Sequence, residues 1–188
     1  MFTLKQLTTI PNLLTCSRFI FAPILLWFAA QQNEVGFLIL LMISFTTDVL
    51  DGMTARLLNQ SSELGAKLDT FADIIIYTTI AISAWWLWPD TVLQQLNYFI
   101  VIVVSYLAPI MIGFIKFRAL TSYHTWLVKF AVVVVACAFF ILFIFGLAWP
   151  LHLASLIAVV AAIEEIAITL ISKKLQSDIA SIWLLLRR

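Results

Sequence analysis

The 188 residues have 63% hydrophobic side chains, 11% charged side chains and a formal net charge of +1. Long apolar runs, such as 74–88 and 131–148, would expose too much nonpolar surface in water, which excludes a soluble domain with a single core. The sequence contains no basic stripe with interleaved aromatic residues, so nucleic acid is excluded as a partner.

The apolar runs predict six membrane-spanning helices of roughly 20 to 25 residues, separated by polar or proline-containing breaks. In chain order the spans are expected at 10–31, 36–58, 63–88, 94–117, 123–147 and 150–173. Short amphipathic helices are expected at 2–9 and 177–187. The first apolar segment lacks a clear cleavage site, so we expect it to be retained. The predicted fold class is an all-α integral membrane protein, with residues 1–188 forming one membrane domain.

The positive charges predict how the chain is oriented. All eleven lysines and arginines lie near the amino terminus, near the junctions between spans two and three and between spans four and five, or near the carboxyl terminus. With six spans these four places share one side of the membrane. By the positive-inside rule, that side is the cytoplasm, and both termini face it. In a bacterium the membrane would be the inner membrane.

Two rows of acidic and small residues stand out in spans two and three. Each row lies along one helix face: Asp48, Asp51, Gly52 and Ala55, then Gly65, Asp69 and Asp73. The short connection predicts antiparallel neighbours, so the rows are expected to face each other. Carboxylates at membrane depth are costly without compensation, and oxygen ligands without Cys or His favour Mg²⁺, Mn²⁺ or Ca²⁺. The four aspartates could hold two such ions.

The small residues beside the aspartates have a second implication. Glycine in a helix interior costs about 0.5 to 1 kcal/mol relative to alanine, so Gly52 and Gly65 indicate the close approach of a ligand or of another backbone. Ala55 fits the same interpretation, because a nucleotide ring could pack on such a surface. Arg56 offers a cation for a phosphate or for a motif carboxylate. Ordinary helix packing remains the alternative for both glycines.

The pattern across residues 48–73, D-x2-D-G-x2-A-R-x8-G-x3-D-x3-D, has every position filled and resembles the signature of the CDP-alcohol phosphotransferases. The stretch 10–18 resembles the opening of the phosphatidylglycerophosphate synthase group, with Ile10, Pro11, Asn12, Thr15 and Arg18 in place. The resemblance implies an enzyme of phospholipid biosynthesis. It would transfer a phosphatidyl group from CDP-diacylglycerol to a polar alcohol and release CMP.

The resemblance also implies roles for individual residues. Two divalent ions, Mg²⁺ or Mn²⁺, would be ligated by Asp48, Asp51, Asp69 and Asp73, and Asp73 would also be the general base for the acceptor hydroxyl. The residues that would bind the CDP portion are Asn12, Asp48, Gly52, Ala55, Arg56 and Gly65. The partners would be the bilayer lipid CDP-diacylglycerol, a soluble alcohol and a second copy of the chain in a homodimer.

Glycerol 3-phosphate is the expected acceptor, which would give phosphatidylglycerophosphate. The candidate acceptor-binding residues are Lys116, Arg118, His124 and Lys129. The basic residues have an alternative role as interfacial anchors, and His124 has one as a cap of the fifth span. The Gly-Lys-x-Lys-Thr stretch expected at the start of this span is replaced by residues 122–129, so inositol phosphate, serine and choline remain alternatives.

Two further acidic residues, Glu164 and Glu165, lie inside the sixth span. Adjacent helical positions point about 100° apart, so at most one is expected to face the catalytic cavity. That glutamate could pair with a basic group, extend its carboxylate to the membrane surface, or be protonated.

A proton- or cation-coupled transporter is the alternative function, from a different class of membrane protein. Against it, the runs 74–88 and 131–148 contain no polar path to the far side of the membrane.

Overall fold

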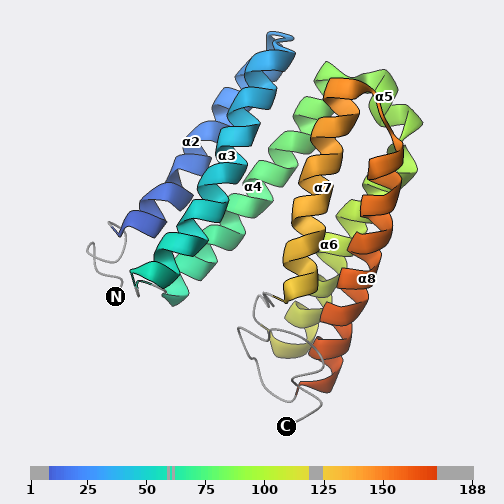
Figure 1. Cartoon of the computed structure of the whole chain (residues 1–188). Coiled ribbons are helices and arrows are strands. Elements are labelled where there is room, and N and C mark those ends of the chain that lie inside the picture. The colour runs from blue at the N-terminus through green and yellow to red at the C-terminus, as the bar shows by residue number, and fades with distance from the viewer. Residues whose placement is uncertain (1–8, 59, 61, 119–124, 173–188) are drawn as a thin grey trace. The chain divides into compact units, whose positions relative to one another are not determined.

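The computed structural model describes residues 9–58, 60, 62–118 and 125–172. Within these ranges the chain forms helices and short connections, with no β-strand (Figure 1). The helices are α2 (Ile10–Ala30), α3 (Glu34–Leu57), α4 (Glu63–Leu87), α5 (Pro89–Gln94), α6 (Leu96–Phe117), α7 (Trp126–Phe145) and α8 (Trp149–Ile171). The short helices expected at 2–9 and 177–187 fall almost entirely outside the described residues.

Six of the described helices are long and apolar enough to cross a membrane: α2, α3, α4, α6, α7 and α8. Each coincides with a predicted span to within a few residues, which confirms the all-α integral membrane fold. Helix α5 was not predicted, because the Trp88–Pro89 step was interpreted only as a break. Pro89 instead occupies the first helical position, where its missing N–H leaves no hydrogen bond unmade.

Polar side chains determine where several helices begin. Asn33 accepts a hydrogen bond from the Gly36 N–H at the start of α3 (2.9 Å), and Ser62 accepts one from the Gly65 N–H at the start of α4 (3.0 Å). Such caps satisfy backbone donors that have no partner within the helix. The cap at Ser62 matters most for the site, because it fixes the start of α4, the helix that carries Asp69 and Asp73.

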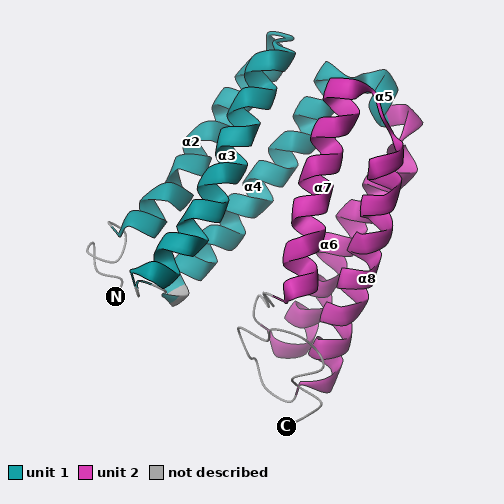
Figure 2. Cartoon of the chain, in the orientation of Figure 1, with its two compact units in different colours: residues 1–92 teal, residues 93–188 magenta. Residues whose placement is uncertain are grey.

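The chain divides into two compact units, residues 1–92 and 93–188 (Figure 2). In unit 1, α2 packs against both α3 and α4. Its core is apolar: the buried side chains include Leu25 and Ala29 of α2, Phe37 and Leu41 of α3, and Ala72 and Ile76 of α4. Many other large apolar side chains of these helices are exposed, as expected for surfaces that hydrocarbon covers.

In unit 2, α8 packs against both α6 and α7. Helix α6 buries small or compact residues at intervals of four, Ser105, Pro109 and Gly113. Helix α8 buries Ala154, Ser155, Ala161 and Ala162. Small side chains allow helix backbones to approach closely in a membrane, where the hydrophobic effect contributes little to helix association. That residues 1–188 form one membrane domain stays a prediction.

Candidate active site

A buried arginine connects the three long helices of unit 1. The Arg18 side chain comes from α2 and is only 2% exposed. Its Nη1 lies 2.6 Å from Asp48 Oδ1 and 2.7 Å from Asp73 Oδ1. Its Nη2 lies 3.1 Å from Asp51 Oδ2 and donates a hydrogen bond to Asp69 Oδ1. All four aspartates of the motif therefore contact one guanidinium group.

The arginine pairs the aspartates across the two helices that carry them. Each of its terminal nitrogens contacts one aspartate of α3 and one of α4: Nη1 contacts Asp48 and Asp73, and Nη2 contacts Asp51 and Asp69. The predicted convergence of the two rows is therefore present. Its origin differs from the prediction of two facing helices, because α2 packs against both α3 and α4 and contributes the bridging cation.

The donor set suits a hard divalent ion. Asp48, Asp51 and Asp69 each contribute one oxygen, and these oxygens lie within 4.8 Å of one another. Asp51 is buried, whereas the side chains of Asp48 and Asp69 are 31% and 32% exposed. Asp73 joins the cluster through Nη1 of Arg18. One guanidinium carries a single positive charge, so four ionised carboxylates leave three negative charges for other cations to balance.

Thr15 supports the cluster from the same helix as Arg18. Its buried hydroxyl lies 2.7 Å from Asp51 Oδ2 and 3.1 Å from the Pro11 carbonyl oxygen. A hydroxyl hydrogen bond to one carboxylate oxygen restricts the orientation of that group. Sequence reasoning placed Thr15 and Arg18 in the opening stretch but assigned neither to the site. A cation inside a predicted membrane span was the available signal for Arg18.

Gly65 has close neighbours, but they are side-chain atoms and not the ligand or backbone that its position predicted. A β-carbon at this residue would lie 2.9 Å from Asn12 Oδ1 and 3.2 Å from Ser62 Oγ. Asn12 is itself buried, so its amide fills the space beside the glycine. Gly65 thus allows α2 and the first turn of α4 to meet near the aspartates.

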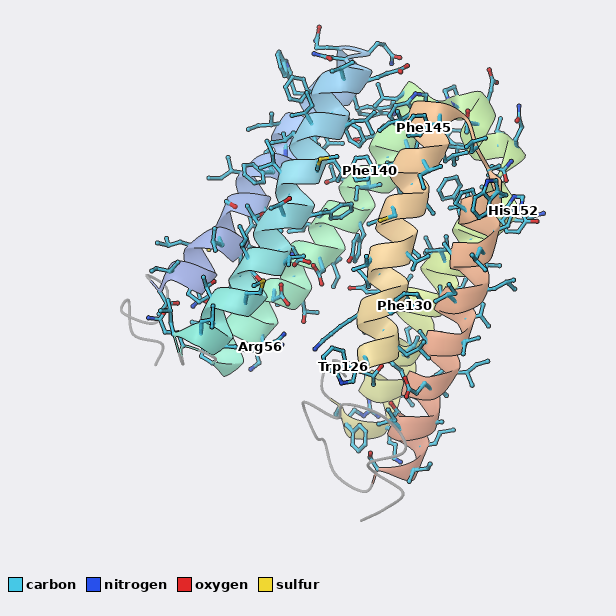
Figure 3. All side chains as sticks on the ribbon, in the orientation of Figure 1. Arg56, Trp126, Phe130, Phe140, Phe145 and His152 are labelled. Carbon is cyan, nitrogen blue, oxygen red and sulfur yellow. The ribbon has the colours of Figure 1, made fainter. Side chains whose placement is uncertain are left out.

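Gly52 differs from Gly65. A β-carbon at Gly52 would have one neighbour within 4 Å among the described residues, Arg56 Nη2 at 4.0 Å. Packing within unit 1 therefore does not require a glycine there. Ala55 is half-buried and Arg56 is exposed near the carboxyl end of α3 (Figure 3).

The two glycines make a matched pair for a stability test. Gly65→Ala and Gly52→Ala gain similar helix propensity, so the difference between them isolates the contact at Gly65. We expect Gly65→Ala to have a free energy of unfolding about 1 to 2 kcal/mol below that of Gly52→Ala, because Asn12 and Ser62 must move. Equilibrium unfolding in detergent measures both values. Equal values would show that the Asn12 contact carries no strain.

The candidate acceptor-binding residues that the structure describes lie in unit 2. Lys116 Nζ donates to the carbonyl oxygens of Thr169 (2.9 Å) and Leu170 (2.8 Å), which places a cation at the carboxyl end of α8. Arg118 is exposed and ends α6 in the left-handed conformation, with φ of 53°. Lys129 Nζ lies 5.4 Å from the ring centroid of Trp126, at the start of α7 (Figure 3).

The remaining polar candidates are His124, Glu164 and Glu165. His124 falls outside the described residues. Glu164 and Glu165 are both half-buried in α8, and each has an interaction within the chain.

Comparison with known proteins agrees with the motif. The family model for CDP-alcohol phosphatidyltransferase matches residues 8–173. The chain is 34% identical over 93 residues to CDP-diacylglycerol--glycerol-3-phosphate 3-phosphatidyltransferase of Aquifex aeolicus (strain VF5), a match covering 50% of this chain and 52% of that protein. It is 32% identical over 113 residues to cardiolipin synthase (CMP-forming) of Streptomyces coelicolor, covering 54% and 53%.

A human relative, also named cardiolipin synthase (CMP-forming), is 34% identical over 94 residues, covering 50% of this chain and 31% of that protein. The chain thus spans about half the length, or less, of these curated relatives. No solved structure matches. The family model covers most of the chain and includes all four aspartates, which confirms the resemblance. The chain belongs to the CDP-alcohol phosphatidyltransferase family.

Proposed function

We propose that the protein is a phospholipid-biosynthetic enzyme that transfers a phosphatidyl group from CDP-diacylglycerol to an alcohol and releases CMP. The observation that carries this proposal is the convergence of Asp48, Asp51, Asp69 and Asp73 on one point of unit 1. Such a concentration of negative charge in membrane-spanning helices is costly unless it serves a site. The names of the relatives agree with this chemistry.

The site we propose holds two divalent ions, Mg²⁺ or Mn²⁺, on these four aspartates. Their oxygens are the ligand type that both ions prefer, and three of the four already lie close together. When bound, the ions would neutralise the pyrophosphate of CDP-diacylglycerol and stabilise the departing CMP.

Asp73 is the proposed general base. The acceptor hydroxyl would pass its proton to the Asp73 carboxylate while its oxygen forms a bond to the phosphorus that carries diacylglycerol. The bond from that phosphorus to the bridging oxygen of CMP would break, and CMP would leave with the electron pair. Residues proposed to bind the CDP portion are Asn12, Asp48, Gly52, Ala55, Arg56 and Gly65. For Gly52, support comes from the lack of any neighbour closer than Arg56 Nη2, at 4.0 Å, among the described residues.

Glycerol 3-phosphate is the proposed acceptor, and the name of the Aquifex relative supports it. Its phosphate would be bound by Lys116, Arg118, His124 and Lys129. A second candidate is phosphatidylglycerol, which would give cardiolipin. The cardiolipin synthases among the relatives favour it.

We propose that the active site faces the cytoplasm. In unit 1, Arg56 and Lys67 lie near the ends of α3 and α4 that carry the aspartates. In unit 2, Lys116, Arg118 and Lys129 lie where α6 ends and α7 begins. The positive-inside rule assigns such ends to the cytoplasmic side. A homodimer is proposed on the family resemblance.

The direct test is CMP release by the purified protein in detergent with CDP-diacylglycerol and Mg²⁺ or Mn²⁺. Separate reactions contain glycerol 3-phosphate, phosphatidylglycerol, inositol phosphate, serine or choline. We expect one acceptor to give metal-dependent turnover well above the rest, and we expect that acceptor to be glycerol 3-phosphate. The absence of CMP with every acceptor, from folded and metal-replete protein, would contradict the transferase and direct attention to ion transport.

A further inference from the structure

Arg18 contacts one oxygen of each aspartate of the proposed metal site. Its Nη2 contacts one oxygen of Asp51 and one of Asp69, and its Nη1 does the same for Asp48 and Asp73. A divalent ion held by these same oxygens would have to replace the arginine nitrogens that contact them, because both cations would use the same ligand atoms.

The surroundings of Arg18 show what keeps it there. Its Nε is buried and has no hydrogen-bond partner among the described residues. Buried donors are normally paired, so this guanidinium is positioned by the aspartates and not by a complete set of bonds to the fold. Apart from the four aspartates, the Arg18 guanidinium therefore has few hydrogen bonds that would hold it in place.

Three of the aspartates are partly accessible, whereas Arg18 is not. The side chains of Asp48, Asp69 and Asp73 are between 26% and 32% exposed, whereas Arg18 is 2% exposed. A cation can therefore reach these carboxylates while Arg18 is still buried, and it can then compete for the oxygens that Arg18 contacts. Competition between the two does not require unit 1 to unfold.

We propose that Arg18 is an internal counterion that holds the four aspartates together in the metal-free protein and gives up these contacts when divalent ions bind. This inference rests on the proposed metal site. By linkage, Arg18 and the ions weaken each other's binding by the same factor. Arg18 therefore lowers metal affinity while it preserves the fold of the metal-free enzyme.

Mn²⁺ binding without substrate is the test, measured by electron paramagnetic resonance on wild type, Arg18→Gln and Arg18→Lys. We expect Arg18→Gln to bind Mn²⁺ at least about tenfold more tightly than wild type, because the competing cation is gone. Arg18→Lys should lie between the two, since an ammonium keeps the charge but lacks the planar fork. Lys67→Gln, which removes an exposed charge two residues from Asp69, should change the affinity less than about twofold.

Thermal unfolding provides a second readout. Without metal, Arg18→Gln should melt well below wild type, and saturating Mn²⁺ should recover most of the difference. Affinity for Mn²⁺ that is equal to or weaker than wild type would overturn the proposal, because it would mean that Arg18 organises the ligands without competing for them.

A measurement on unmodified protein covers the case in which Arg18→Gln does not fold. In protein with ¹⁵N-labelled arginine, the Arg18 guanidinium signal, assigned by its loss in Arg18→Lys, should shift with Mg²⁺ at the concentration that saturates the site. An unchanged signal at saturation would overturn the proposal while leaving the transferase intact. If wild type neither binds Mn²⁺ nor releases CMP, the proposed function fails as well.

Discussion

Asp73→Asn should lower kcat for phosphatidyl transfer by about 10³-fold or more, because an amide cannot take the acceptor proton and is a poor metal ligand. The fold should persist, since asparagine has nearly the same volume and its carbonyl oxygen can still accept the hydrogen bond that Arg18 donates to Asp73. Affinity for CDP-diacylglycerol should change little. Steady-state CMP release and equilibrium binding of CDP-diacylglycerol measure these two effects separately.

Asp90→Asn is the matched control for this substitution. Asp90 is exposed in the first turn of α5 and makes no contribution to the Arg18 cluster. The same chemical change there should leave kcat within about twofold of wild type. If Asp73→Asn kept more than about a tenth of wild-type kcat, Asp73 would lose the role of general base.

Removal of divalent ions should have an effect of similar size. We expect a chelator to lower turnover by at least about 10²-fold, because the pyrophosphate and the departing CMP then lose their main electrostatic stabilisation. Added Mg²⁺ or Mn²⁺ should restore the rate. The helical circular dichroism spectrum should stay the same throughout, because the proposed counterion role of Arg18 keeps the aspartates of α3 and α4 together without ions.

A chelator saturated beforehand with Mg²⁺ is the control for effects of the reagent itself. It should leave the rate unchanged. Turnover that persists in excess free chelator, with ion content verified by elemental analysis, would contradict a metal-dependent mechanism. Loss of the helical spectrum on chelation would instead contradict the role assigned to Arg18.

Local sequence patterns predicted most of the fold. Apolar length and turn chemistry located all six long helices, because membrane spans must satisfy their own backbone hydrogen bonds and be about as long as the bilayer is thick. Helix α5 was missed because Pro89 both interrupts an apolar run and suits the first position of a helix. Spacing alone does not decide between these two effects.

For the candidate site, spacing predicted which residues share a face but not what lies between the faces. The i, i+4 arrangement of Asp69 and Asp73 is local, so it could be read from the chain. The contact of Arg18 with Asp73 joins residues 55 positions apart and depends on how α2 packs against two other helices. A cation among the aspartates was expected from their charge, but the sequence pattern did not show that Arg18 of α2 contacts all four of them.

Residues at helix ends were the hardest to assign from sequence. Lys116 was expected to bind an acceptor phosphate or anchor the interface, and the structure shows it bonded to carbonyl oxygens at the end of α8. A lysine near a membrane boundary can do any of these, and residue type alone does not separate them. The identity of the acceptor therefore stays a prediction, whereas the family is shown by the match over residues 8–173.

The most direct test of the account follows the phosphate that is transferred. CDP-diacylglycerol labelled in the phosphate attached to diacylglycerol is incubated with purified protein and Mg²⁺, in separate reactions with each acceptor of the panel, glycerol 3-phosphate first. We predict that the label moves into a new phospholipid in equal amount to the CMP released, with wild type but not with Asp73→Asn. Label that stays in CDP-diacylglycerol, or that appears as phosphatidic acid whatever acceptor is present, would contradict it.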